Sequence, residues 1–303
     1  MRIVFMGTPE FAVPSLERLL ADGHEVAAVF TQPDKPRSRM KLIPSPVKAA
    51  ALQHGLTVLQ PTTIRDEAVL QQVRDLHPEL LVVVAYGKIL PKALLEIPTV
   101  AAINVHSSIL PRYRGAAPIN WAILQGDTET GVTVQHLGEE LDAGDIILVK
   151  RTAIDPQEDA GQLYDRLAVL GAEALSEAAA ALAAGTAERI PQGAAIEPYA
   201  AMLSREMSPI DWNKPAQTIV NQIRGLIPWP CASMELEGKR VKVYRGAVGA
   251  NTSAQPGAIV SADKRGIAVA AGDDRTVVIT QLQPEGGKRM AADAYLLGHP
   301  IKV

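Results

Sequence analysis

Short apolar runs alternate with helical patterns through the first half of the chain, and this alternation restricts the fold more than any other feature. The clearest run, Leu-Leu-Val-Val-Val-Ala at residues 80–85, has the composition of a strand that is buried on both faces. Similar runs occupy residues 3–6, 26–31 and 101–106, and helical patterns occupy residues 11–20, 47–54 and 92–96. Strands separated by helices predict an α/β fold, with a mostly parallel sheet covered by helices on both faces.

The pattern changes after this alternation. Residues 131–137 predict another strand, residues 146–152 a hairpin partner for it, and residues 161–184 a long helix with an apolar stripe. No periodicity is present in residues 186–205, which Pro and Gly interrupt. We therefore predict a first domain at residues 1–185, a linker at 186–205 and a second domain at 206–303.

The second domain has the pattern of a small β-structure. One amphipathic helix passes through Ile219, Ile223 and Leu226. Short β-prone runs follow at residues 241–244, 258–260, 267–270 and 277–280, with glycines between them. Short strands at this spacing indicate a small barrel.

The charge is spread unevenly over the two domains. The 303 residues carry a formal net charge of −3, which excludes a generally basic nucleic-acid-binding chain. Residues 206–303, however, contain 12 Lys and Arg against 9 Asp and Glu, a net charge of +3. This excess suits weak contact with a phosphate backbone, although ordinary scatter in composition also explains it.

Cysteine content and hydropathy indicate the compartment. The single cysteine, Cys231, cannot form an internal disulfide, and its apolar surroundings favour a buried structural thiol in a reducing compartment. No stretch approaches the ~20 apolar residues of a membrane span. We expect a cytoplasmic protein without membrane contact, and without a metal, because the chain lacks closely spaced His or Cys ligands.

A candidate site lies at the end of the apolar run at residues 100–105. Asn104 and His106 are two residues apart on a predicted strand, so their side chains share one face while Val105 points into the core. Asp142, in a later glycine-containing loop, is the third candidate. Each residue also has an ordinary structural role, since a histidine can lie at a polar rim and an aspartate can form a turn.

The three residue types suit attack of an amine on an activated carbonyl. Asn104 can donate a hydrogen bond to the oxyanion without changing charge, and His106 can donate as an imidazolium or move a proton near neutral pH. Asp142 can orient His106 or accept the proton of the amine. A nicotinamide cofactor is not expected, because the turn at Gly7-Thr8-Pro9 has one glycine where a dinucleotide fingerprint needs three.

Two segments resemble the formyltransferase family that uses 10-formyltetrahydrofolate. They are residues 104–119 (Asn-Val-His-Ser-Ser-Ile-Leu-Pro-Arg-Tyr-Arg-Gly-Ala-Ala-Pro-Ile) and residues 141–146 (Leu-Asp-Ala-Gly-Asp-Ile). The resemblance implies that Asn104, His106 and Asp142 are catalytic and that no metal takes part. It also implies a folate site formed by Ser108, Ile109, Leu110, Pro111, Tyr86 and Gly87, with Ile109 in place of a family leucine.

The resemblance covers essentially the whole chain and points to the branch of this family that acts on aminoacylated initiator tRNA. It rests also on residues 6–11, 30–36, 44–48 and 228–230. It implies a Rossmann-like first domain and a second domain that is an oligonucleotide-binding (OB)-like barrel for tRNA. A basic loop at residues 35–42 would meet the acceptor stem through Arg37, Arg39 and Lys41.

The expected reaction is therefore formyl transfer from 10-formyltetrahydrofolate to the α-amino group of methionyl-initiator tRNA, by a monomer, in support of translation initiation. One alternative is a formyltransferase with the same site that acts on an amino sugar or a glycinamide nucleotide. A second is a hydrolase that removes formyl from the folate, and a third is a non-enzymatic RNA-binding module.

Overall fold

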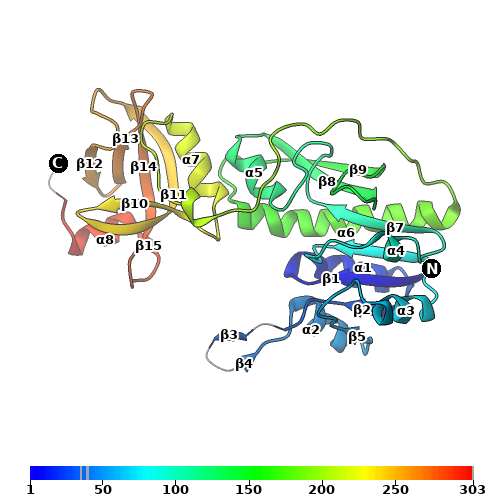
Figure 1. Ribbon diagram of the computed structural model, residues 1–303. Helices are drawn as coiled ribbons and strands as arrows, with labels where there is room; N and C mark the ends of the chain where they lie inside the picture. The colour runs from blue at the N-terminus through cyan, green and yellow to red at the C-terminus, as the bar shows by residue number, and fades with distance from the viewer. Residues whose placement is uncertain (35, 39–40, 302–303) are drawn as a thin grey trace. The chain divides into compact units, whose positions relative to one another are not determined.

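The computed structural model describes residues 1–34, 36–38 and 41–301. The chain forms two compact units (Figure 1). The first unit consists of Met1–Gly115, Glu129–Thr152 and Tyr164–Ala200, and the second consists of Ala116–Thr128, Ala153–Leu163 and Ala201–Val303. Both units are therefore built from segments that are separated in the sequence.

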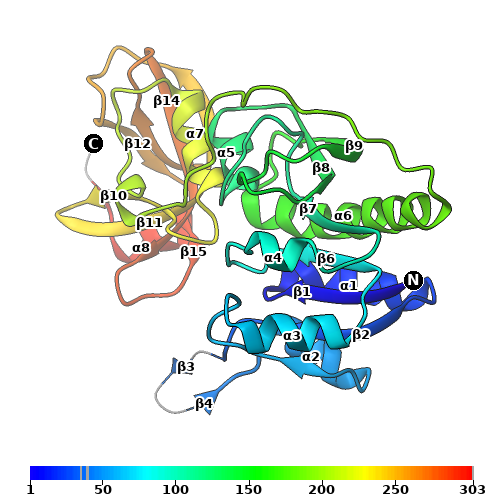
Figure 2. The same ribbon diagram turned by 45° about the vertical axis from the view of Figure 1, so that its right-hand side comes forward.

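A seven-stranded sheet forms the centre of the first unit, and both views in Figures 1 and 2 show it. Its strands are β1 (Arg2–Gly7), β2 (Glu25–Phe30), β5 (Val58–Leu59), β6 (Leu80–Val84), β7 (Ala101–His106), β8 (Glu129–His136) and β9 (Ile146–Ala153). They lie in the order β5-β2-β1-β6-β7-β8-β9. The strands from β5 to β7 are parallel, and β8 runs antiparallel to β7. The predicted mostly parallel sheet is confirmed.

Helices cover both faces of this sheet. On one face, alternate residues of the central strands, such as Met6 and Val83, pack with Val69 of α3 (Glu67–Asp75) and Leu94 of α4 (Lys92–Leu95). The opposite face receives α6 (Ala160–Ala184), where a Cβ added to Gly171 would lie 3.1 Å from a methyl group of Val105. Side chains on a strand alternate between the two faces, so Asn104 and His106 lie on the face opposite to Val105.

The first two helices begin where proline fits the first turn. A 3₁₀ turn, η1 (Glu10–Ala12), precedes α1 (Val13–Ala21), so the regular helix starts later than the predicted residue 11. Pro14 accounts for this, because a proline in the first helical turn removes only an amide that would have no partner. In α2 (Pro46–Gln53), Ser45 caps the helix by accepting a hydrogen bond from the Lys48 amide.

An antiparallel sheet forms the centre of the second unit. Its strands are β10 (Ala232–Leu236), β11 (Lys239–Asn251), β12 (Ile259–Asp263), β13 (Gly266–Ala270), β14 (Arg275–Pro284) and β15 (Met290–Ala291). The order is β10-β11-β14-β13-β12, with β15 paired to β14. The predicted second domain of β-strands is thus confirmed, and its strand pairs are antiparallel. Closure into an OB-like barrel stays a prediction.

The remaining helices of this unit are α5 (Pro118–Leu124), α7 (Ala216–Gly225), α8 (Ala292–Gly298) and the 3₁₀ turn η2 (Arg205–Met207). Helix α7 packs its apolar side, including Ile219 and Ile223, on the sheet. Its other neighbour is α5, where Asn120 donates a hydrogen bond of 2.8 Å to the Gly225 carbonyl oxygen. Residues 116–128 therefore pack with the second unit, although they lie within the predicted first domain.

Helix α6 is long and apolar enough to cross a bilayer by length and composition alone, which the sequence analysis did not anticipate. Its 25 residues have many alanines, and 44% of its most apolar window is buried in the structure. Of the predicted stripe, Leu163, Leu167, Ala174 and Ala178 are buried, whereas Leu170 and Leu182 are half-buried. The helix thus buries an apolar side within the fold.

Candidate active site

The carboxyl end of β7 carries Asn104 and His106 on one face of the sheet, as predicted. The Val105 side chain between them is 4% exposed and packs towards α6. His106 is buried, whereas Asn104 is half-buried. Among the residues that the structure describes, the side-chain amide of Asn104 makes no hydrogen bond. Its two N–H donors are therefore available for a substrate oxygen.

Two buried polar residues of β8 lie directly across from this pair. Gln135 is opposite Asn104, and Thr133 is opposite His106, in the antiparallel register of β7 and β8. Directly opposite residues share a face, so four polar side chains gather there. Neither Thr133 nor Gln135 was predicted from the sequence. In the sequence, the only sign of these two residues is that they alternate with valines in a predicted strand. In the structure, both side chains are completely buried.

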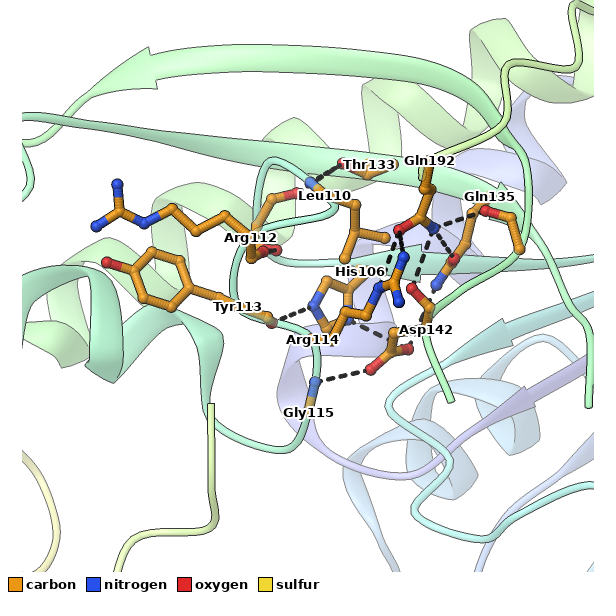
Figure 3. Close-up of polar contacts among 12 residues, drawn as sticks. His106, Leu110, Arg112, Tyr113, Arg114, Gly115, Thr133, Gln135, Asp142 and Gln192 are labelled. Atoms are coloured by element: carbon orange, nitrogen blue, oxygen red, sulfur yellow. Dashed lines mark hydrogen bonds and ion pairs between the residues drawn. The ribbon is translucent and has the colours of Figure 1, made fainter. Parts of the chain in front are cut away.

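Both ring nitrogens of His106 face oxygen atoms (Figure 3). Nε2 lies 2.9 Å from the Tyr113 carbonyl oxygen, which can only accept, so Nε2 carries a proton. Nδ1 lies 3.6 Å from Oδ1 of Asp142, an ion-pair distance when the imidazole is charged. This arrangement fixes the plane of the ring and turns it towards the carboxylate.

Asp142 is held by two hydrogen bonds to its carboxylate. Oδ2 accepts one of 3.0 Å from the Gly115 amide, and Oδ1 accepts one of 3.3 Å from Nε2 of Gln135. The side chain is 10% exposed. The backbone of Asp142 has a φ of 51°, a left-handed conformation that costs a residue with a Cβ roughly 1–3 kcal/mol. The surrounding contacts must hold the loop in this conformation.

Gln192 and Arg114 extend the hydrogen-bond network around Asp142 (Figure 3). Nε2 of Gln192 lies 2.8 Å from Oε1 of Gln135 and 3.0 Å from the Asp142 carbonyl oxygen. Arg114 donates to the side-chain oxygen of Gln192 over 2.9 Å. Gln192 lies in the segment predicted as a linker, and no pattern in the sequence marked it.

The predicted folate segment follows β7 and is fixed by hydrogen bonds. The Ser108 hydroxyl donates to the Arg112 carbonyl oxygen over 2.7 Å, and Thr133 Oγ1 bonds both the Ser108 carbonyl oxygen and the Leu110 amide. Ser108 and Leu110 are buried, whereas Ile109 and Pro111 are half-buried. Within this segment, Ile109 and Pro111 therefore have exposed side-chain surface that a ligand could contact.

The loop at Tyr86 and Gly87 is tied to the ends of neighbouring strands. The Tyr86 carbonyl oxygen accepts hydrogen bonds from Thr8 and Gln32. Gly87 has a φ of +80°, and a Cβ there would lie 2.4 Å from the Gln32 amide nitrogen. The Tyr86 ring is 1% exposed, and burial raises the pKa of its phenol to about 12. A ligand at this loop would meet the backbone rather than the phenol.

The predicted tRNA-binding residues lie in a loop between β2 and α2. Arg37 is in β3 (Pro36–Ser38) and Lys41 is in β4 (Lys41–Leu42), and these strands pair as a short hairpin. Arg39 lies outside the described residues. At the base of the loop, Lys48 bonds Asp34 over 2.5 Å and Gln60 over 2.6 Å, which joins the two ends of the loop.

Comparison with known proteins defines the class. Residues 1–179 match the formyl transferase family, and residues 202–300 match the C-terminal domain of formyl transferases. The chain belongs to the formyl transferase family. No group of three or more His, Cys, Asp or Glu that could hold a metal is found among the residues that the structure describes.

Relatives with a more specific name match along almost the whole chain. A protein from Geotalea daltonii named methionyl-tRNA formyltransferase is 48% identical over 302 residues, which are 99% of this chain and 96% of the relative. One of the same name from Moorella thermoacetica is 49% identical over 99% of this chain and 97% of its own length.

Solved structures share the fold at lower identity. An N-formyltransferase from Helicobacter canadensis, in complex with folinic acid and dTDP-3-aminofucose, is 18% identical, with a TM-score of 0.68. The match covers 91% of this chain and 98% of that one. At this identity the likeness extends to the fold and not to the acceptor.

Proposed function

We propose that this chain transfers the formyl group of 10-formyltetrahydrofolate to the α-amino group of methionine on initiator tRNA. Near-complete coverage of relatives named methionyl-tRNA formyltransferase supports this acceptor. The single observation that carries the chemistry is the placement of His106 between the Tyr113 carbonyl oxygen and Asp142. Beside it lies the Asn104 side-chain amide, which has no hydrogen-bond partner among the described residues. Together these groups provide donors for an oxyanion and an acceptor for a proton.

The proposed step begins with the neutral amine of methionine attacking the formyl carbon. As the new C–N bond forms, negative charge develops on the formyl oxygen. The side-chain amide of Asn104 and the Nδ1–H of His106 donate hydrogen bonds to that oxygen, since Nε2 of His106 already donates to the Tyr113 carbonyl oxygen. Each donor is worth about 10²–10³ in rate. The oxyanion then collapses, and the bond between the formyl carbon and N10 of the folate breaks.

Proton movement completes the balance of the step. The attacking nitrogen must lose a proton, and N10 of the folate must gain one as it leaves. The Asp142 carboxylate accepts the amine proton directly or through water, and this proton then passes through water to N10 as the folate leaves, which regenerates the carboxylate. Oδ1 of Asp142, 3.6 Å from Nδ1, holds the charged imidazole in orientation. Both roles need an ionised Asp142 next to a protonated His106.

The folate fits the edge of the sheet where β6 and β7 end, the usual position for ligands in open α/β sheets. Half-buried Ile109 and Pro111 supply apolar surface there. The backbone at Tyr86 and Gly87 supplies polar groups, and Ser108 and Leu110 act by fixing the shape of the segment. The residues present therefore fit a folate as substrate.

For tRNA, we propose that Arg37, Arg39 and Lys41 of the basic loop contact the acceptor stem. The domain at residues 206–303, with its net charge of +3 and an OB-like fold, contacts the tRNA backbone. Residues 1–185 form the catalytic domain and residues 186–205 the connection. The protein acts in the cytoplasm as a monomer.

His106→Ala tests the proposal. Removing the ring eliminates an oxyanion donor and the partner of Asp142, so kcat should fall about 10²–10⁴-fold while the Kd for initiator tRNA stays within about twofold. His54→Ala is the matched control, because His54 is a surface residue paired with Glu17. Wild-type kcat in His106→Ala would reject this site, and a wild type that binds tRNA without any turnover would favour the binding module.

A further inference from the structure

We infer that Gln192 is a positioning residue that holds the Asp142 loop in its active geometry. The inference rests on the proposed function, since it gives a role to a residue that does not touch the reacting atoms. Gln192 lies in a segment without helix or sheet periodicity. That segment forms parallel bridges with the stretch after His106, at Arg112–Ile196 and Gly115–Ala200.

The side-chain nitrogen of Gln192 meets three acceptors around Asp142. Nε2 lies 3.0 Å from the Asp142 carbonyl oxygen, 2.6 Å from the Gly144 carbonyl oxygen and 2.8 Å from Oε1 of Gln135. An amide nitrogen has two hydrogens, so the three contacts share them. One side chain therefore fixes two carbonyl groups of the loop and one side chain of β8.

Arg114 determines which way the Gln192 amide points. Its Nε and Nη2 atoms donate to Oε1 of Gln192 over 3.2 and 2.9 Å, and Nη2 also donates to the Gly193 carbonyl oxygen over 3.0 Å. A guanidinium has only donors, so the oxygen of the amide must face Arg114. The nitrogen then faces the Asp142 loop, as the contacts require.

The same logic orients Gln135. Its Oε1 accepts from Gln192, which leaves its own Nε2 to donate to Oδ1 of Asp142 over 3.3 Å. Arg114 thus orients the amide of Gln192, Gln192 orients the amide of Gln135, and Gln135 donates to the carboxylate that faces His106. The ionised Asp142 carboxylate has only acceptors and also favours the Gln135 nitrogen, so Gln192 fixes the Gln135 amide from its other end.

The loop needs this support because its backbone is constrained. Asp142 has a φ of 51°, and a Cβ on Gly144 would lie 1.8 Å from the His136 carbonyl oxygen. The loop therefore approaches β8 closely at a glycine while it holds a left-handed aspartate. Loss of the two carbonyl contacts should let this loop relax and move the carboxylate away from Nδ1.

Two substitutions separate positioning from bulk stability. Gln192→Ala removes all contacts, whereas Gln192→Glu keeps an oxygen for Arg114 and loses both N–H donors. We expect both variants to lower kcat about 10–100-fold, with KM for tRNA and folate within about threefold, because a shift of about 1 Å is enough for such a loss. Gln71→Ala, at an exposed glutamine of α3, is the matched control.

A structural measurement does not depend on turnover. The Gly115 amide donates to Oδ2 of Asp142, so its hydrogen exchange, followed by NMR, reports the position of the carboxylate. We expect faster exchange in Gln192→Ala and Gln192→Glu and wild-type exchange in Gln71→Ala. Wild-type protection at Gly115, or wild-type kcat in Gln192→Glu, would overturn the inference. Absence of formyl transfer by the wild type would instead count against the proposed function.

Discussion

At the scale of single residues, Asn104 differs from the polar side chains around it in having no hydrogen-bond partner among the described residues. Its donors are therefore available for the oxyanion, and Asn104→Ala should lower kcat about 10²–10³-fold. Folding and tRNA affinity should change little, because the side chain is half-buried and supports no neighbour. Steady-state kinetics beside Asn251→Ala, an exposed control, checks this, and unchanged kcat would remove Asn104 from the mechanism.

Tyr86 gives a second prediction at this scale. Its hydroxyl is buried without a hydrogen-bond partner among the described residues, and burial raises the pKa of the phenol to about 12. Burial penalises the ionised phenolate, so this penalty is absent below pH 10, the ordinary pKa, and the fold loses stability as the pH rises from 10 towards 12. Tyr86→Phe should therefore unfold at equal or higher urea concentration at pH 7 and lose less stability between pH 9 and 11.

The Tyr86→Phe variant also gives a prediction for folate binding. Since the phenol is buried and the loop offers its backbone, Tyr86→Phe should bind the folate with wild-type KM. A marked rise in KM would show that the hydroxyl reaches the ligand. A lower urea midpoint would show that it has a partner.

At the scale of structural elements, Lys48 connects the ends of the basic loop through Asp34 and Gln60. The hydrogen bond from Lys48 is the largest cause that holds the pKa of Asp34 below its usual 3.8, followed by the bond from Gln60. Lys48→Met keeps the length of the side chain and removes the charge. It should lower the free energy of unfolding by roughly 1 kcal/mol at pH 7, because the pair is only partly exposed.

The pH dependence follows from the direction of that shift. The stabilisation by Asp34 is present above pH 3.8 and disappears as the pH falls through the lower pKa of the folded state. Urea unfolding of wild type and Lys48→Met should therefore converge below pH 3.8. Lys92→Met, which removes an exposed ion pair with Glu139, is the control and should unfold at the same urea concentration as wild type.

Elements with uniform periodicity could be predicted from the sequence, and those with mixed patterns could not. The central strands β1 and β6 are largely apolar, β7 is apolar up to Asn104, and α6 has a regular stripe of leucines and alanines. By contrast, β11 was predicted at four residues and extends over 13, Lys239–Asn251, with shifts in register to β14 that break the alternation. A bulged strand loses the period of two by which strands are recognised.

The candidate site shows the same division. Asn104 and His106 could be placed together because one strand carries both, and the resemblance of the Asp142 loop supplied the third residue. Gln192 is close to Asp142 only through bridges between irregular segments, which have no sequence period. Gln135 lay in a predicted strand, but only the register with Asn104 reveals its position.

At the scale of the whole molecule, the uneven charge gives a prediction for tRNA binding. Arg240 and Lys242 are exposed on β11, in the domain with a net charge of +3. If each neutralises one phosphate, changing both to Gln should reduce the slope of log affinity against log salt by about 2 and leave kcat unchanged. Titration of labelled initiator tRNA at several salt concentrations measures the slope. An unchanged slope would place the tRNA elsewhere on the protein.

The acceptor is the central claim, and one assay tests it most directly. Purified protein and 10-formyltetrahydrofolate are incubated with methionyl-initiator tRNA, uncharged tRNA or a dTDP-amino sugar, and both formylated product and folate turnover are quantified. We predict formylmethionyl-tRNA in the first reaction and negligible folate turnover in the other two. Formylated sugar without formylmethionyl-tRNA, or equal folate turnover in all three reactions, would contradict the account and point to a sugar formyltransferase or a folate hydrolase.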